Sequence, residues 1–379
     1  MKRSLNNLSK CNIVPAITTE ITHRLKDCLP FYGAIWSEEH NGYSLAGAYL
    51  PLFTAPMACV VDDKNYLTFD QNNIIPIIPR TVSFETRMKL AKQSVWITVG
   101  LDEFEKIINT EVSFGTDTYI CVDIANGHMK KLLGLCKEAK LKFDNLTLMA
   151  GNIANPSTYE EYAKVGVDYV RIGIGFGSAC STNDLTGIGY SPYTFLSDLK
   201  WRKERVSTDY KRLTSRFKSV PYIVYDGGCE SIRDIIVALA LGADYVMCGK
   251  MFAQTNEACG KIIPKKVTRT VEKHCKKFID PELELIEDDV QPFEYIEDIT
   301  ETVFVNGRMY YGMSTERAQR EMGNTKIKYS EGKEYWVPIL YTLKDWVSQF
   351  IAAITSSMSY CNAKTLQDFI GVPEVRLDY

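Results

Sequence analysis

Eight short apolar runs recur along the first two thirds of the chain, and each is long enough to form one β-strand. The runs occupy residues 51–55, 74–78, 95–99, 119–123, 146–150, 168–172, 221–225 and 244–248. Successive runs start roughly 20–27 residues apart, with one longer gap after the sixth, and this spacing is typical of βα units. Apolar residues follow one another within the runs, which indicates strands that are covered on both faces.

Two segments between the runs carry the start and stop signals of helices. Asn155 is a capping residue followed by Pro156, and Ser231 opens a segment that ends at Gly242. Strands that alternate with helices in eight units predict an α/β fold of the (β/α)8 TIM-barrel type. A doubly wound parallel sheet is the rival prediction, although it does not account for eight units.

Polar residues and glycines gather immediately after the predicted strands. They are Asp123, Gly151, Asn152, Cys180, Asp226, Gly227, Gly228, Gly249 and Lys250. Barrels of this type carry their chemistry on the loops at the carboxyl ends of the strands. The pattern therefore predicts one functional site, built from several of these loops.

The loop after the sixth run is rich in glycine and contains a single cysteine, Cys180, among hydroxyl-bearing residues. Its glycines are Gly173, Gly175, Gly177, Gly187 and Gly189. So many glycines in residues 171–190 indicate unusual backbone angles or close approach to a ligand. A thiol on such a loop is well placed to act as a nucleophile. The plainer alternative is an inert thiol in a turn.

The loops after the last two runs have the features of an anion site. Residues 226–231 lead into a helix N-terminus, whose free amides and dipole favour negative charge. Gly249 follows the eighth run, and barrels commonly bind phosphate with the loops after strands 7 and 8. Asp226 would then accept hydrogen bonds from ribose hydroxyls. Alternatively, these glycines serve only the turns.

Composition narrows the class of protein. The 379 residues are 45% hydrophobic with a net charge of −3, so no basic excess points to nucleic acid. No apolar run reaches the ~18 residues that a membrane span needs, and the N-terminus lacks the apolar core of a signal peptide. The eleven cysteines show no pairing pattern, which indicates reduced thiols. We therefore expect a cytoplasmic protein that binds neither nucleic acid nor membrane.

Five segments together resemble the IMP dehydrogenase/GMP reductase family. They are residues 177–182, 186–190, 226–228, 247–253 and 310–314, and their order and spacing match over most of residues 50–368. The resemblance implies a (β/α)8 barrel that is usually a homotetramer. It also implies an oxidoreductase in which a cysteine attacks purine C2 and a nicotinamide exchanges hydride with that carbon.

Within the family, three further segments resemble the reductases. They are residues 123–127 after the fourth strand, 329–333 in the flap, and 356–360 near the C-terminus. The Arg-Tyr pair typical of the dehydrogenases is not evident between Met313 and Glu331, and no pair of regulatory cystathionine-synthase-type domains follows the second strand. The resemblance thus implies one catalytic domain over residues 1–379, with a C-terminal flap and tail and an inserted finger at 261–309.

The resemblance also assigns roles to individual residues. Cys180 is the implied nucleophile, and Thr182 with Glu331 the pair that delivers a proton to the departing amine. The substrate, a purine nucleoside 5′-monophosphate, is expected to contact Ser178, Asp226, Gly228, Gly249, Lys250, Met313, Ser314 and Lys328. NADPH is the implied cofactor, held by Asp123, Asn126, Gly127, Ser356 and Tyr360. Carbonyls of Gly175, Gly177 and Cys180 match ligands of a monovalent cation, usually K⁺.

Plainer alternatives remain for three of these residues, since Glu331 could be a surface acid, Thr182 a turn residue and Asp123 a helix cap. The chain also departs from the family pattern at Phe176, Lys328 and Gln254. The segment from Gly260 to Tyr310 is longer than the family's finger. Its pattern predicts a charged helix at 271–277, an acidic stretch at 282–289 and a hairpin at 303–310 with an Asn-Gly turn.

Three functions follow as hypotheses. The first is GMP reductase, which converts GMP to IMP and ammonia through a covalent thioimidate on Cys180. The second is IMP dehydrogenase, or a relative that acts on another purine nucleotide. The third is a nucleotide-binding protein without activity, but such a protein would need neither Cys180 nor Thr182 with Glu331.

Overall fold

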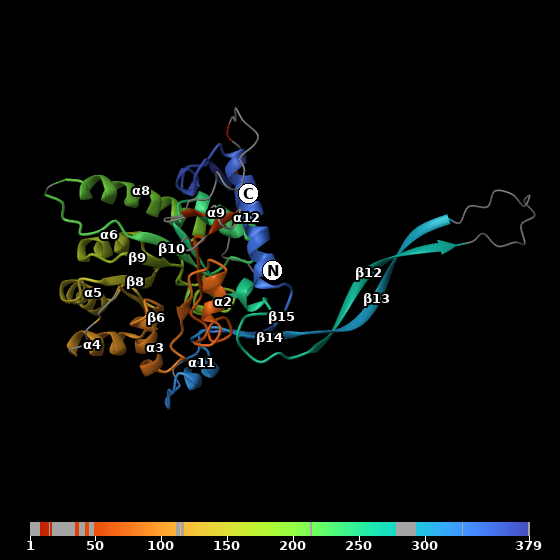
Figure 1. Cartoon of the computed structure of the whole chain (residues 1–379), viewed down its shortest axis with the longest axis horizontal. Coiled ribbons are helices and arrows are strands. Elements are labelled where there is room, and N and C mark those ends of the chain that lie inside the picture. Colours follow the sequence, from red (N-terminus) through yellow and green to blue (C-terminus); the bar gives the residue numbers. More distant parts are fainter. Residues whose placement is uncertain are drawn as a thin grey trace, which may run out of the picture.

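All eight predicted strands lie in one parallel sheet of the computed structural model (Figure 1). They are β4 (Leu52–Thr54), β5 (Ile77–Ile78), β6 (Trp96–Val99), β7 (Thr118–Asp123), β8 (Leu146–Ile153), β9 (Tyr169–Ile172), β10 (Tyr222–Asp226) and β11 (Tyr245–Cys248). Their order around the sheet is β4-β11-β10-β9-β8-β7-β6-β5. The end strands meet, because the Thr54 amide donates to the carbonyl of Ile75 at 3.0 Å. The sheet is therefore the predicted (β/α)8 barrel, and the doubly wound alternative is wrong.

The structure describes residues 8–14, 16, 35–37, 42–44, 49–110, 114, 117–212, 214–277, 293–327 and 329–377. Its helices are α2 (Tyr66–Gln71), α3 (Phe84–Ala91), α4 (Leu101–Asn109), α5 (Lys130–Lys142), α6 (Pro156–Val165), α7 (Thr182–Thr186), α8 (Pro192–Tyr210), α9 (Ile232–Ala240), α10 (Lys250–Ala253), α11 (Glu316–Glu321), α12 (Leu343–Tyr360) and α13 (Leu366–Phe369), after a 3-10 turn at Leu8–Lys10. Among these described helices, none is both long and apolar enough to cross a bilayer.

Both predicted helix starts are confirmed. The Asn155 side chain accepts a hydrogen bond of 2.9 Å from the amide of Ser157 at the start of α6. Ser231 caps α9 by accepting from the amide of Asp234. The long gap after the sixth strand contains α7 and the 19-residue helix α8.

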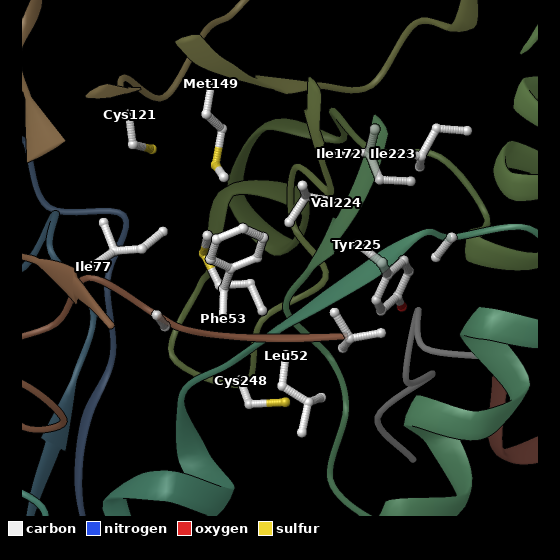
Figure 2. Packing of buried hydrophobic residues seen from close by; sticks show 14 of the residues in the cluster. Leu52, Phe53, Ile77, Cys121, Met149, Ile172, Ile223, Val224, Tyr225 and Cys248 are labelled. Atoms are coloured by element: carbon white, nitrogen blue, oxygen red, sulfur yellow. The ribbon is translucent and has the colours of Figure 1, made fainter. Parts of the chain in front are cut away.

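The interior of the barrel is filled by side chains of its own strands (Figure 2). Phe53 lies among them without exposed surface, and its ring contacts the rings of Trp96, Tyr169 and Tyr245 at centroid distances of 5.2–5.9 Å. Trp96, Tyr169 and Tyr245 are the first residues of their strands, so this aromatic cluster closes the N-terminal end of the barrel. A cavity of about 790 Å³ with aromatic walls opens at that end. It is therefore separate from the loops that carry Cys180.

A two-stranded arm projects from one side of the barrel (Figure 1). It consists of β12 (Lys265–Lys277) and β13 (Phe293–Val305), which pair in antiparallel register from Lys265↔Val305 to Lys277↔Phe293. The predicted helix at 271–277 is wrong, because these residues belong to β12. Val267, Thr268, Thr270 and Val271 in its first half are β-branched residues, which favour a strand. The acidic stretch at 282–289 lies outside the described residues.

The predicted hairpin at 303–310 is also wrong. Asn306 separates β13 from β14 (Gly307–Tyr311), but β14 pairs with β15 (Glu334–Pro338) and not with β13. Gly307 is needed for packing, because a Cβ there would lie 2.4 Å from the Trp336 ring. The remaining strands form two small pairs, β1 (Cys11–Ile13) with β16 (Val375–Leu377) and β2 (Ile35–Ser37) with β3 (Gly42–Ser44).

Candidate functional site

Cys180 lies in the loop between β9 and α7, and a segment from the far end of the sequence holds this loop in place. Cys180 forms an antiparallel bridge with Gly332. On either side of it, the amide of Ser181 donates to the carbonyl of Glu331 at 2.7 Å, and the amide of Lys333 donates to that of Ala179 at 2.8 Å. The backbone of 331–333 therefore fixes the position of the thiol, which remains partly exposed.

The three predicted catalytic residues form one chain of hydrogen bonds. The Cys180 thiol donates to the Thr182 hydroxyl at 3.3 Å, and this hydroxyl donates to Oε2 of Glu331 at 2.5 Å. Thr182 is the first residue of α7, so the loop and the helix start place both side chains together. A thiol linked through a hydroxyl to a carboxylate can lose and regain a proton without bulk water.

Glycines let the flap approach closely. A Cβ on Gly332 would lie 2.6 Å from the methyl group of Thr315 and 2.9 Å from the Ser314 hydroxyl oxygen. A Cβ on Gly312 would lie 2.8 Å from the carbonyl oxygen of Ala179. Met313 and Ser314, two of the expected base contacts, are thereby brought beside the Glu331 segment. Lys328, another expected contact, lies outside the described residues.

Arg171 joins two acids that were predicted to bind different ligands. Its side chain is almost fully buried at the end of β9, where Nη1 donates to Asp123 and Nη2 to Asp226, each at 2.8 Å. Asn152 donates to the same oxygen of Asp226 at 2.8 Å. The ends of β7, β8, β9 and β10 thus form one polar cluster beneath the Cys180 loop. The Asn152 and Arg171 contacts fix how Asp226 is oriented.

The electrostatics of this cluster keep Asp123 ionised. Burial opposes its charge, but the guanidinium groups of Arg171 and Arg80 hold the pKa of the carboxyl below its ordinary value. Burial likewise opposes the charge of Arg171, yet its neighbours Cys121, Asp226 and Asp123 raise the pKa of the guanidinium well above its usual range. An ionised carboxylate at a strand end is a suitable acceptor for ribose hydroxyls.

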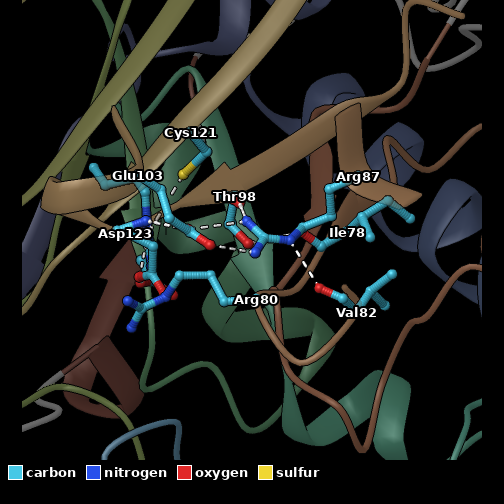
Figure 3. A network of polar contacts seen from close by, with 11 residues as sticks. Ile78, Arg80, Val82, Arg87, Thr98, Glu103, Cys121 and Asp123 are labelled. Carbon is cyan, nitrogen blue, oxygen red and sulfur yellow. Dashed lines mark hydrogen bonds and ion pairs between the residues drawn. The ribbon is translucent and has the colours of Figure 1, made fainter. Parts of the chain in front are cut away.

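Arg80 approaches Asp123 from the loop after β5, with its Nε 3.7 Å from the carboxylate (Figure 3). The same figure shows Arg87, which donates hydrogen bonds to Glu103 at 2.6 Å and to the carbonyl of Val82 at 2.9 Å. These contacts stabilise the loop that carries Arg80. Sequence reasoning gave no role to Arg80 or Arg171. The one available signal was a charged residue inside the apolar run 168–172.

The expected phosphate loops lie against one another. A Cβ on Gly227, whose φ is 93°, would lie 2.9 Å from the amide nitrogen of Gly177, next to Ser178. A Cβ on Gly249 would lie 2.7 Å from the hydroxyl oxygen of Tyr310. Gly228 also has a positive φ, of 81°, and Lys250 pairs with Glu230 at 3.1 Å. Small residues are therefore required where the loops after β9, β10 and β11 converge.

The remaining expected cofactor and cation residues fall into three places. The Asn126-Gly127 turn packs on Asn152, because a Cβ on Gly127 would lie 2.7 Å from its carbonyl oxygen. Ser356 and Tyr360 are exposed on α12, and within the described chain no hydrogen bond or ion pair links them to the Cys180 loop. Gly175 has a φ of 81°, and the carbonyl of Gly177 accepts from the Cys180 amide. Among the described residues no group of three His, Cys, Asp or Glu side chains could hold a metal.

Comparison with known proteins gives consistent matches. The sequence profile of the IMP dehydrogenase / GMP reductase domain matches residues 87–275. GMP reductase 2 of Homo sapiens is 27% identical over 271 residues, which are 71% of this chain and 64% of the human protein. GMP reductase of Vibrio atlanticus (strain LGP32) is 24% identical over 341 residues, 87% of this chain and 83% of that protein.

A dehydrogenase is similar as well. Inosine-5′-monophosphate dehydrogenase of Chlorobaculum parvum (strain DSM 263 / NCIMB 8327) is 30% identical over 276 residues, 69% of this chain but 45% of that protein. The chain thus spans less than two thirds of the length of the dehydrogenase and, at 64%, of the human reductase.

Proposed function

Because the chain belongs to the IMP dehydrogenase/GMP reductase family, we propose that it is a GMP reductase, which converts GMP to IMP and ammonia with NADPH. The observation that carries this proposal is the hydrogen-bonded series from the Cys180 thiol through Thr182 to Glu331. It unites a nucleophile with a proton carrier, and deamination of C2 requires both.

The first step forms a bond between Cys180 Sγ and C2 of GMP. The thiol proton passes to Thr182 and from there to Glu331. Glu331 then protonates the C2 amine, so that the C2–N bond breaks and ammonia leaves. A thioimidate remains on Cys180, and the charge balances because the proton lost by sulfur is the one gained by nitrogen. NADPH, when bound, supplies the hydride that replaces sulfur at C2 and frees the thiolate.

The residues at the strand ends fit the expected ligands. The ionised, oriented carboxylate of Asp123 would accept from the nicotinamide ribose, and Asn126 with Gly127 would line the same side. Asp226 would accept from the substrate ribose, while Ser178, Gly228, Gly249 and Lys250 would hold the 5′-phosphate. Met313 and Ser314 would contact the base. Their closeness to the Glu331 segment supports a base held over Cys180.

The proposal includes the assembly. We infer a single catalytic domain over 1–379 with an inserted finger at 261–309, working in the cytoplasm as a homotetramer. Exposed Ser356 and Tyr360 on α12 would then serve a neighbouring subunit's cofactor. Carbonyls of Gly175, Gly177 and Cys180 would bind K⁺.

The test is direct. Purified protein is mixed with GMP and NADPH, or with IMP and NAD, and the near-ultraviolet absorbance of the reduced nicotinamide is followed. We expect loss of absorbance with GMP and NADPH, and release of ammonia in equal amount. IMP dehydrogenase is the second candidate, favoured by the 30% identity to the dehydrogenase of Chlorobaculum parvum. A rise in absorbance with IMP and NAD, without reaction of GMP, would establish it instead.

A further inference from the structure

Tyr335 on β15 makes a contact that the sequence did not predict. Its hydroxyl donates a hydrogen bond of 2.8 Å to the hydroxyl of Ser178, on the loop that carries Cys180. Tyr335 is partly buried, and Ser178 is an expected phosphate contact. A hydroxyl supplied by the flap therefore reaches the place where the substrate's phosphate is proposed to bind.

Other polar groups surround the same point. Tyr310 lies directly opposite Tyr335 in the β14–β15 pair, with ring centroids 5.5 Å apart. The Tyr310 hydroxyl lies close to Gly249 and also interacts with Ser178. Burial raises the pKa of Tyr335, while its contact with Ser178 and the charge of Lys250 act to lower it. Burial also raises the pKa of Tyr310 well above its usual value, so both tyrosines remain protonated at neutral pH and keep a proton to donate.

Tyr335 is also tied to the catalytic acid along the chain. Glu331 stands four residues before it, in the segment whose backbone is bonded to Ala179, Cys180 and Ser181. In extended chain, four residues span about 13 Å. Residues 331–335 are thus a short segment that is attached to the barrel at both ends, by the Glu331–Thr182 contact and by the Tyr335–Ser178 contact.

We propose that Tyr335 turns its hydroxyl hydrogen from Ser178 to the 5′-phosphate when the substrate binds, so that both hydroxyls donate to the phosphate. Through residues 331–335, Tyr335 also holds Glu331 against Thr182. Tyr335 is thus a positioning residue for the proton carrier as well as a phosphate contact. The inference rests on the proposed function. By linkage, phosphate binding at the Tyr335 end and docking of Glu331 on Thr182 must strengthen each other by the same factor.

The first experiment measures binding and needs no turnover. Inorganic phosphate, GMP and guanosine are titrated by calorimetry into the full chain and into Tyr335→Phe, which removes one hydroxyl. We expect about tenfold weaker binding of phosphate and GMP, as loss of one charge-assisted hydrogen bond implies, and guanosine within twofold. Equal weakening of GMP and guanosine, or of neither, overturns the phosphate role.

The matched control is Tyr311→Phe. Tyr311 is the next residue after Tyr310 on β14, and its hydroxyl donates to Glu321, away from the phosphate loops. This variant should bind phosphate and GMP within twofold of the wild type. If it weakens both as strongly as Tyr335→Phe does, the effect is a general loosening of the β14–β15 pair, and the proposal fails.

The second experiment measures coupling to the catalytic acid. Thr182→Val removes the hydroxyl that bonds Glu331 while preserving the shape of the side chain. We expect it to weaken the binding of inorganic phosphate about threefold in the wild-type background and not at all in the Tyr335→Phe background. Equal effects in both backgrounds reject the coupling. If the protein binds phosphate in this pattern but does not reduce GMP, the inference about Tyr335 stands and the proposed reaction is wrong.

Discussion

Thr182 donates a hydrogen bond of 2.5 Å to Glu331, although the two residues are 149 positions apart in the sequence. The contact joins the first residue of α7, on the barrel, to the flap segment that precedes β15. Proton transfer in the proposed reaction therefore depends on docking of the flap onto the barrel. Changes in either element should affect turnover more than nucleotide binding, and the following predictions separate the two.

Cys180→Ala should abolish turnover and leave the affinity for GMP within about threefold, because the thiol forms the covalent bond but makes no phosphate contact. The measurements are the initial rate with GMP and NADPH and the dissociation constant of GMP by calorimetry. Activity within a few-fold of wild type in this variant would contradict covalent catalysis by Cys180.

Glu331→Gln keeps the size of the side chain but removes its ability to carry a proton. We expect the rate of ammonia release to fall at least about a hundredfold, while the dissociation constant of GMP changes little. Ammonia and oxidised cofactor are assayed from the same reaction. A comparable loss in binding and in rate would mean that Glu331 mainly holds the flap.

Arg171→Met should destabilise the fold strongly. Removing this buried cation leaves the carboxylates of Asp123 and Asp226 without their central partner, and losing one member of a buried ion pair typically costs about 3–5 kcal/mol. Urea unfolding measures the change. Arg320→Met is the control, because Arg320 forms an exposed pair with Glu316, and its loss should change stability by less than about 0.5 kcal/mol.

The low pKa of Asp123 makes the stability of the fold depend on pH. In the folded chain its pKa lies below the ordinary 3.8. Its ionised form therefore contributes stability above pH 3.8, and this contribution disappears as the pH falls through the folded-state value. Asp123→Asn should be less stable than wild type at neutral pH, and the difference in unfolding free energy should shrink at lower pH. A difference independent of pH would contradict ionisation as its source.

The 5′-phosphate should dominate nucleotide affinity. Guanosine should bind at least about a hundredfold more weakly than GMP, because it lacks several charge-assisted hydrogen bonds. Gly249→Ala should reduce this preference, since the new Cβ would displace the Tyr310 hydroxyl. Calorimetry with both ligands gives the ratio. Equal affinities in the wild type would show that the loops after β10 and β11 do not bind phosphate.

The barrel was predictable because its strands are local patterns. Strands such as 168–172 and caps such as Ser231 can be recognised from a few consecutive residues. The position of the functional loops at the carboxyl ends of the strands then follows from the barrel topology. Cys180 and Thr182 are neighbours in sequence, so their proximity needed no structure. The pairing of Thr182 with Glu331 came only from family resemblance, and the structure supplies its geometry.

The missed features depend on contacts between distant residues. The segment 271–277 has helix-forming lysines, yet its pairing with β13 makes it a strand. The sequence predicted that Gly307 serves a turn. In the structure a side chain is excluded at this position because the Trp336 ring packs against it. Nothing local in the sequence distinguishes Tyr335, and the local signal for Arg171 is limited to its charge inside an apolar run. The partners of both residues lie on other elements.

The β12–β13 arm leaves and rejoins the barrel at almost the same point. The amide of Ile263, before the arm, donates to the carbonyl of Gly307, after it, at 2.7 Å. The two attachment ends are thus already clasped together, as at the base of a hairpin. The arm is therefore a detachable appendage. A short turn from Ile263 to Gly307 could replace it without reopening the barrel or shifting β14, so its length is free to vary while Tyr310 keeps its place over Gly249.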